Sequence, residues 1–176
     1  MKNPANRVFL IGMPGSGKST IGRGLAKALG RPFMDLDHEI EVRCGVAIPV
    51  IFEIEGEQGF RKRESQVLQE VAQLPDTVVA TGGGAVLAPQ NRVLLSTEGT
   101  VVYLKASVDE LYRRTSRDRN RPLLATNDPK GRLQELFDQR GAIYESLADI
   151  VLETGSASVP SAVQQIVVKL KELENA

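Results

Sequence analysis

One eight-residue segment near the N-terminus constrains the fold of this chain more than any other feature: Gly12-Met13-Pro14-Gly15-Ser16-Gly17-Lys18-Ser19. It matches G-x-x-x-x-G-K-[ST], which forms a phosphate-binding loop where it joins a strand to a helix. The apolar residues 8–11 precede it, and Ile21, Leu25 and Leu29 follow it at helical spacing. The expected strand before the segment and the expected helix after it are the two elements that a phosphate-binding loop joins. The segment therefore predicts an α/β fold that binds a nucleoside triphosphate.

Each part of this loop has a separate task. The glycines let backbone N–H groups converge on phosphate oxygens, and the N-terminus of the following helix adds a favourable field. Lys18 is expected to reach the β- and γ-phosphates, and the Ser19 hydroxyl is expected to coordinate Mg²⁺. The residues expected to bind the nucleotide in this segment are Gly15, Ser16, Gly17, Lys18, Ser19 and Thr20.

Short β-branched runs alternate with helical patterns along the chain. Strands are expected at residues 8–11, 33–36, 77–81, 100–104 and 150–152, and one of the intervening helices should run through residues 67–74 and end at Pro75. This alternation predicts a three-layer α/β/α architecture with a five-stranded parallel sheet. In such sheets ligands bind at the carboxyl ends of the strands. The length of 176 residues fits a single domain, 1–176.

The charge balance disfavours two broad classes of partner. Lys and Arg number 22 and Asp and Glu number 22, so the net charge is zero. Proteins that coat nucleic acid, or bind membranes by charge, usually have a positive excess. No apolar run approaches the roughly 20 residues of a membrane span, and the single cysteine, Cys44, fits a reducing compartment. We therefore expect a cytoplasmic protein with small-molecule partners, and neither nucleic acid nor a membrane.

Two carboxylates and three glycines follow the second and third expected strands. Strand alternation would put Asp35 and Asp37 on one face, at the edge where a metal ion and a substrate would lie. Asp35 could hold Mg²⁺ together with Ser19, and Asp37 could accept a hydrogen bond, or a proton, from an alcohol. Asp37 could instead cap the helix that begins at His38. Gly82-Gly83-Gly84 would let backbone N–H groups approach a ligand, unless the three glycines only form a strained turn.

Arginine is concentrated in one part of this otherwise neutral chain: Arg113, Arg114, Arg117, Arg119 and Arg121. Turn-forming residues follow them, which predicts a mobile lid at about residues 113–128. We expect Arg121 to deliver positive charge to a transferred phosphoryl group. Most of the others are expected on a solvated helix face, with Arg113 or Arg114 against the adenine.

Two arginines lie outside this group. Arg61 follows a short apolar helical segment beside a glycine turn, and Arg140 lies late in the helix after the expected lid. A pair of guanidinium groups from separate elements could hold a small carboxylate between them. The sequence alone does not place the two arginines together.

Six motifs, in order along nearly the whole chain, resemble the shikimate kinase family of the nucleoside-monophosphate-kinase-like P-loop group. They are Gly12 to Ser19, Asp35-x-Asp37, Gly56-Glu57-x-x-Phe60-Arg61-x-x-Glu64, Gly82-Gly83-Gly84, Arg121-Pro122-Leu123-Leu124, and Arg140-x-x-x-Tyr144-x-x-x-Ala148-Asp149. The first of these is generic, whereas the joint occurrence of the other five is highly specific. The sequence departs slightly from the family at Ala47, where relatives often have Ser or Thr.

This resemblance implies a reaction: ATP-dependent phosphorylation of the 3-hydroxyl of shikimate, giving shikimate 3-phosphate and ADP in aromatic amino-acid (chorismate) biosynthesis. It also implies in-line phosphoryl transfer with Mg²⁺ and a substrate-binding subregion at about residues 37–61. We expect a monomer.

By the same resemblance each candidate residue has a role. Asp37 and the backbone of Gly82, Gly83 and Gly84 would bind the shikimate hydroxyls, and Arg61 and Arg140 would hold its carboxylate. Glu64 would support Arg61. The catalytic residues would be Lys18, Asp37 and Arg121; Ser19 and Asp35 would serve the metal, and Arg113 and Arg121 would join the loop in binding ATP.

Three other functions share some of these features. A gluconate kinase of the same group would share the P-loop and the lid, but not the set formed by Arg61, Gly82–Gly84 and Arg140. A nucleotide kinase would transfer to a phosphate and would not need a carboxylate-binding pair. A non-catalytic ATP-binding regulatory module would bind ATP without acceptor-dependent release of ADP.

Overall fold

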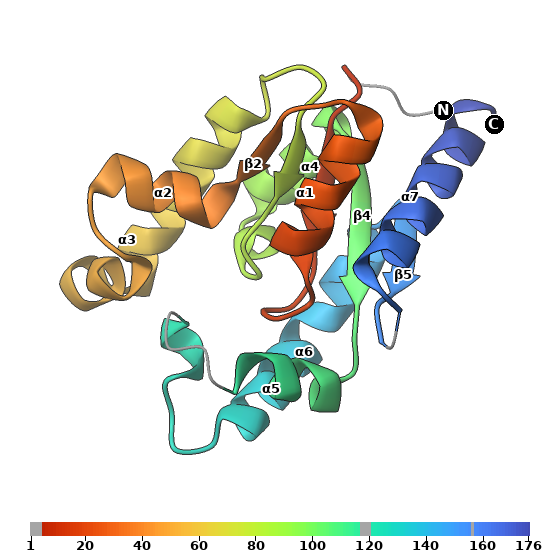
Figure 1. Cartoon of the computed structure of the whole chain (residues 1–176). Coiled ribbons are helices and arrows are strands. Elements are labelled where there is room, and N and C mark those ends of the chain that lie inside the picture. The colour runs from red at the N-terminus through yellow and green to blue at the C-terminus, as the bar shows by residue number, and fades with distance from the viewer. Residues whose placement is uncertain (1–4, 117–120, 156) are drawn as a thin grey trace.

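A five-stranded parallel sheet forms the centre of the molecule, with strand order β2-β3-β1-β4-β5 (Figure 1). The computed structural model describes residues 5–116, 121–155 and 157–176. The strands are β1 (Val8–Ile11), β2 (Phe33–Asp35), β3 (Val78–Ala80), β4 (Thr100–Lys105) and β5 (Ile150–Glu153). The five strands expected from the sequence are all present, and their ends agree to within one residue.

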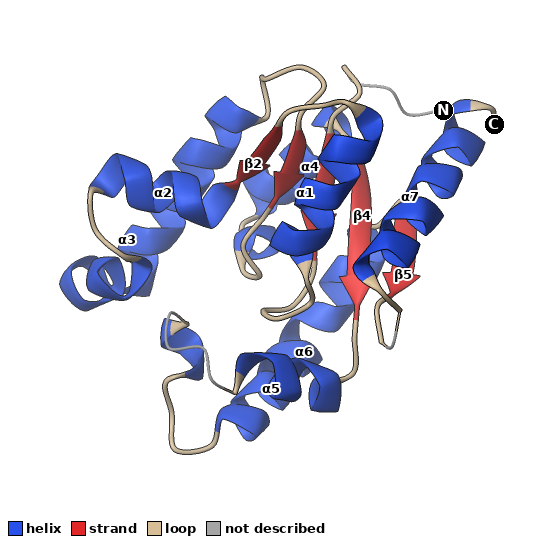
Figure 2. Cartoon of the chain, in the orientation of Figure 1, coloured by secondary structure: helices blue, strands red, loops and turns tan. Residues whose placement is uncertain are grey.

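Helices cover both faces of the sheet, as Figure 2 shows, so the predicted three-layer architecture is confirmed. The α-helices are α1 (Lys18–Leu29), α2 (Leu36–Cys44), α3 (Ile48–Val71), α4 (Pro89–Glu98), α5 (Val108–Thr115), α6 (Pro129–Leu147) and α7 (Val159–Glu174). Two short 3₁₀ helices, η1 (Ala85–Leu87) and η2 (Pro122–Leu124), lie among the loops. None of the helices in the described ranges is long and apolar enough to cross a membrane.

The core is divided into two halves by the sheet. Alternate residues of β1 point to opposite faces, so that Val8 and Leu10 pack with α1 and α7, whereas Phe9 and Ile11 pack toward α3 and α6. All four of these residues are buried. A strand with both faces covered reads as a continuous apolar run, which is why the sequence located β1 correctly.

The segment after β2 differs from the expectation. The strand ends at Asp35, and α2 begins at Leu36, so Asp35 and Asp37 are not alternate residues of one strand. The Asp35 carboxylate caps α2 by accepting a hydrogen bond from the His38 N–H at 3.2 Å. The capping alternative considered for Asp37 is therefore wrong, because the helix begins earlier than predicted.

The helix predicted over residues 67–74 is the second half of a much longer element. α3 begins at Ile48, breaks at Gly56, where φ is 72°, and ends at Val71. Only glycine adopts this left-handed conformation readily. Ala47, at the N-cap of α3, has no side chain that could accept a hydrogen bond, and the Glu41 carboxylate accepts the Ile48 N–H instead, at 2.8 Å.

Two groups of helices lie near the carboxyl ends of the strands. α2 and α3 project to one side of the sheet, and α5 with η2 lies across its lower edge in Figure 1. The predicted lid, residues 113–128, covers the end of α5, η2 and the loop before α6. Its residues 117–120 lie outside the described part of the chain, and Arg117 and Arg119 with them.

Candidate active site

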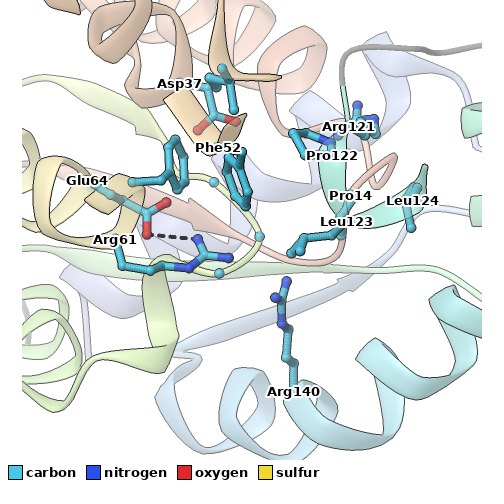
Figure 3. A pocket seen from close by; sticks show the side chains of 15 residues that line it. Pro14, Asp37, Phe52, Arg61, Glu64, Arg121, Pro122, Leu123, Leu124 and Arg140 are labelled. Carbon is cyan, nitrogen blue, oxygen red and sulfur yellow. Dashed lines mark hydrogen bonds and ion pairs between the residues drawn. The ribbon is translucent and has the colours of Figure 1, made fainter. Parts of the chain in front are cut away.

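A cavity lies at the carboxyl ends of β1, β2 and β3, where the sequence predicts ligand binding (Figure 3). Its walls come from six parts of the chain: Pro14, Asp37, Ile48, Phe52, Phe60, Arg61, Glu64, Gly82, Gly83, Gly84, Arg121, Pro122, Leu123, Leu124 and Arg140. One side is charged and the other is apolar. A few convergent polar groups among apolar side chains are typical of a small-molecule site.

The P-loop borders this cavity and is ordered around its lysine. The Lys18 ammonium donates hydrogen bonds to the carbonyl oxygens of Gly12, at 2.7 Å, and Met13, at 2.9 Å. Burial, with a smaller contribution from the positive charge of Arg121, lowers the pKa of Lys18 to about 7. The Ser16 hydroxyl is buried with no hydrogen-bond partner. A lysine so desolvated and an unpaired hydroxyl would both gain from a phosphate in the loop.

Ser19 and Asp35 meet at the start of α1. The Ser19 hydroxyl donates a hydrogen bond to the Asp35 carboxylate, which is the contact expected of two residues that serve one metal ion. Both offer oxygen, the donor that Mg²⁺ prefers. Thr20, the last residue expected to bind the nucleotide, is exposed in the first turn of the same helix.

Asp37 and Glu64 approach Gly82 from two helices. An ideal Cβ on Gly82 would lie 2.8 Å from Asp37 Oδ1 and 2.9 Å from Glu64 Oε2, so that a side chain here would collide with both carboxyl groups. These two oxygens are buried and have no hydrogen-bond partner. Burial raises the pKa of Asp37, and the neighbouring Asp35 adds to the rise. Asp37 therefore offers an unpaired, basic acceptor to a ligand in the cavity.

Arg61 and Arg140 point into this cavity from different helices, α3 and α6 (Figure 3). Arg61 forms an ion pair with Glu64 at 3.1 Å and a second with Glu57 at 3.3 Å. Arg140 is buried; burial lowers its pKa, and the positive charge of Arg61 contributes to this shift. The structure thus brings together two guanidinium groups that the sequence could not place, and an anion between them would relieve their repulsion.

Glu64 gives the free protein a specific dependence of stability on pH. Burial raises the pKa of Glu64 from 4.5 to about 7, although Arg61 opposes the shift. The folded state therefore binds a proton more tightly than the unfolded state. This contribution to stability is fully present below pH 4.5 and is lost as the pH rises through 7.

The variant Glu64→Gln removes this titration. By linkage, we expect the free energy of unfolding of the native protein, relative to that of Glu64→Gln, to fall by about 3 kcal/mol between pH 4.5 and pH 7.5. Urea denaturation of both proteins across this range, without ligands, measures the difference. If the free energies of unfolding of the two proteins change in parallel with pH, Glu64 stays ionised in the folded protein and the expectation is wrong.

Gly84 lies against the Arg61 guanidinium. An ideal Cβ on Gly84 would overlap that group, whose flexible side chain can move aside. We therefore expect Gly84→Ala to fold normally, to displace Arg61, and to raise the KM for the acceptor by about tenfold. Gly141→Ala is the control, because a Cβ there would lie 3.7 Å from Phe137, an ordinary contact. Steady-state kinetics of the two variants test this, and equal acceptor KM values would contradict it.

The arginines of the expected lid separate into two environments. Arg113 is largely exposed and pairs with Glu110 at 2.5 Å. Arg114 donates to the carbonyl oxygens of Gly15 at 3.2 Å and Thr154 at 3.0 Å, and so joins the P-loop to the loop after β5. The structure thus brings Arg114, and not Arg113, to the P-loop. Arg121 lines the cavity, close enough to Lys18 to lower its pKa.

An apolar wall of the cavity was missed from the sequence. Phe52 and Phe60 lie on α3 with ring centroids 4.9 Å apart, and Leu123 and Leu124 of η2 line the same cavity. Aromatic and aliphatic residues at helical spacing are normally core residues. A glycine turn was expected beside Arg61, but nothing in the pattern showed that the aromatic side chains on either side of it would line a cavity.

A P-loop beside a separate charged cavity, both at the carboxyl edge of this sheet, defines a P-loop kinase of the nucleoside-monophosphate-kinase-like class. The family model described as "Shikimate kinase" matches residues 14–171. The shikimate kinase of Bordetella avium is 62% identical over 95% of this chain and 80% of its own length, and that of Burkholderia lata is 51% identical over 97% and 92%. The chain belongs to the shikimate kinase family.

Solved structures agree with this assignment. A shikimate kinase from Acinetobacter baumannii in complex with shikimate superposes with a TM-score of 0.93 and 43% identity, covering 95% of this chain and 93% of its own. A shikimate kinase from Aquifex aeolicus gives 0.82 and 34%, covering 94% and 96%. A gluconokinase from Sinorhizobium meliloti gives 0.63 and 19%, covering 99% and 97%, a likeness that shows the shared fold alone.

Proposed function

We propose that this chain transfers the γ-phosphoryl group of ATP to the 3-hydroxyl of shikimate, forming shikimate 3-phosphate and ADP. Membership of the shikimate kinase family supports this, and so does the relative whose solved structure contains shikimate. Acceptors of the gluconokinase type are disfavoured, since that likeness is only one of fold.

One observation supports the proposal most strongly. In the described part of the chain, the buried side-chain atoms without a hydrogen-bond partner are Ser16 Oγ, Asp37 Oδ1, Arg61 Nε, Glu64 Oε2 and Arg140 Nε. The first belongs to the P-loop, and the other four belong to residues that line the cavity. Buried polar groups are normally paired, because an unpaired one costs free energy. A ligand with a carboxylate and several hydroxyls, such as shikimate, would provide partners for this cavity.

The cavity has a separate place for each part of shikimate. Arg61 and Arg140 would bind the carboxylate, with Glu64 orienting Arg61 through its ion pair. Asp37 and the backbone of Gly82, Gly83 and Gly84 would bind the hydroxyls. Asp37 would accept the hydrogen bond of the reacting hydroxyl, and its raised pKa suits it to take the proton during transfer.

Lys18 and Arg121 would stabilise the charge of the transferred phosphoryl group. Little covalent chemistry is required of a kinase, so positioning and electrostatic stabilisation contribute most of the rate. ATP would raise the lowered pKa of Lys18, so that the lysine is charged when the phosphates are bound. Arg114 reaches the P-loop and the loop after β5, and we assign to it the contact with the nucleotide base expected of Arg113 or Arg114.

Ser19 and Asp35 would hold Mg²⁺ through their oxygen atoms, directly or through water. When bound with ATP, the ion would neutralise negative charge on the β- and γ-phosphates.

The proposal treats the chain as one catalytic unit. The P-loop, the proposed shikimate-binding subregion (residues 37–61) and the arginines of α5, η2 and α6 all contribute to neighbouring sites. We therefore expect it to work as a monomer, with residues 113–128 as its lid.

Product analysis tests the position of the transfer. After reaction with Mg·ATP and shikimate, ³¹P NMR should show a phosphate monoester coupled to the ring proton at C3. A monoester at another carbon would contradict the assignment of the reacting hydroxyl. No monoester at all would contradict the proposed function.

A further inference from the structure

Tyr144 is a buried tyrosine beside the proposed acceptor site, and no role has yet been given to it. It lies one turn after Arg140 on α6, and its ring is fully buried. The ring packs against Tyr103 of β4, with centroids 5.1 Å apart and planes tilted by 31°. Tyr103 pairs with Ile11 in the register of β1 and β4. Packing against Tyr103, on a central strand of the sheet, therefore fixes the position of the Tyr144 ring.

The Tyr144 hydroxyl connects two parts of the acceptor site. It donates a short hydrogen bond, 2.5 Å, to the carbonyl oxygen of Gly83, in the middle of the triple-glycine segment. After giving its one proton to Gly83, the oxygen has only lone pairs to offer, which suits a neighbouring guanidinium group. Arg140, four residues earlier on α6, supplies that group: its Nη1 lies beside Gly83, to which the Tyr144 hydroxyl bonds, and each of the two groups shifts the pKa of the other.

The Arg140 guanidinium is also close to Gly83. An ideal Cβ on Gly83 would lie 3.3 Å from Arg140 Nη1 and 3.0 Å from Pro14 Cδ of the P-loop. Burial raises the pKa of Tyr144 to about 12, so the hydroxyl remains a donor at neutral pH. The Tyr144 hydroxyl and the Arg140 guanidinium thus both lie beside Gly83, in the backbone after β3.

We propose that Tyr144 is a positioning residue: its hydroxyl holds the Arg140 guanidinium against the triple-glycine segment and thereby sets the affinity for the carboxylate of the acceptor. This inference rests on the proposed function, because it assumes that Arg140 binds that carboxylate. Tyr144 does not line the cavity, and it acts only through Arg140.

The stacked pair offers a matched control. Tyr144→Phe and Tyr103→Phe each remove one hydroxyl from the same two rings, and only the first breaks the link to Gly83 and Arg140. We expect Tyr144→Phe to raise the Kd and KM for shikimate by about tenfold, with the KM for ATP unchanged and kcat within about threefold. Tyr103→Phe should leave all of these constants within about twofold of the native values.

A double-mutant cycle with Arg140→Ala distinguishes positioning from a general structural effect. If Tyr144 acts through Arg140, then Tyr144→Phe should change shikimate affinity less than twofold once Arg140 is absent. Equal effects of Tyr144→Phe in both backgrounds would overturn the proposal. So would a parallel rise in the KM for ATP, or a Tyr144→Phe protein that is unfolded at both 10 °C and 25 °C.

Calorimetric titration of the native protein with shikimate separates this inference from the proposed function. If the native protein binds shikimate and Tyr144→Phe binds it equally well, the positioning role is wrong and the function stands. If the native protein binds no shikimate, the proposed function fails, and the role of Tyr144 fails with it.

Discussion

Lys18→Ala is expected to lower kcat by about 10³-fold, because it removes the buried cation of the P-loop. That cation is expected to stabilise the negative charge of the transferred phosphoryl group. The KM for ATP should rise by less than about tenfold, since the backbone N–H groups of the loop remain. Initial rates of ADP release over a range of ATP concentrations separate the two constants.

The fold should survive this change. Burial lowers the pKa of Lys18 to about 7, which means that the ammonium group is costly to bury in the empty protein. We therefore expect a melting temperature close to that of the native protein. Lys27→Ala, at the exposed end of the same helix, is the control and should leave kcat unchanged. Near-normal turnover by Lys18→Ala would remove this residue from the catalytic mechanism.

Arg61→Ala and Arg140→Ala are each expected to raise the KM for shikimate by about 10²-fold while leaving the KM for ATP within about twofold. Each change removes one of two guanidinium groups that are buried or largely buried, and a charge-assisted hydrogen bond from such a group is strong. The matched control is Arg63→Ala, two residues from Arg61, where the guanidinium is exposed and pairs with Glu55. Circular dichroism checks that each variant is folded.

An uncharged acceptor sharpens this test. The carboxamide of shikimate should bind the native protein about 10²-fold more weakly than shikimate does, and Arg61→Ala should discriminate much less between the two. If shikimate saturation is unchanged in both arginine variants, the carboxylate lies elsewhere and the assignment of the cavity is wrong.

The sequence correctly predicted those parts of the molecule that are determined by residues close together in the chain. The P-loop lies between a buried strand and an amphipathic helix, and the order of strands and helices specifies the layers. The helix α5 is capped by Ser107, whose hydroxyl accepts the N–H of Glu110 at 3.2 Å, three residues along the chain. In each case residues close in sequence determine the structure, so a pattern is enough.

Misplaced features depended on contacts between distant segments. Asp35 and Asp37 were expected to alternate along a strand, but β2 is only three residues long, and Asp35 both caps α2 and bonds to Ser19. Because α2 begins between them, strand alternation does not set the positions of the two carboxylates. The kink at Gly56, which places Phe52 and Phe60 on the cavity wall, was likewise invisible in the periodicity.

The different environments of Arg113 and Arg114 also depend on a distant segment and could not be predicted from the local sequence. Both are adjacent to Glu110 in helical spacing, and both form ion pairs with it. Only the position of the loop after β5 decides that Arg114 reaches Thr154 and the P-loop, whereas Arg113 remains exposed. Tertiary structure makes that distinction, and no feature of the local sequence does.

The most direct test of the proposed function is the rate of ADP release from Mg·ATP with shikimate, compared with quinate, gluconate, AMP and no acceptor. We expect rapid release of ADP with shikimate and a rate near background with the others. Release with gluconate or AMP in place of shikimate would keep the P-loop chemistry and contradict the assignment of Arg61 and Arg140. Tight ATP binding without stimulation by any acceptor would contradict catalysis itself and favour a regulatory module.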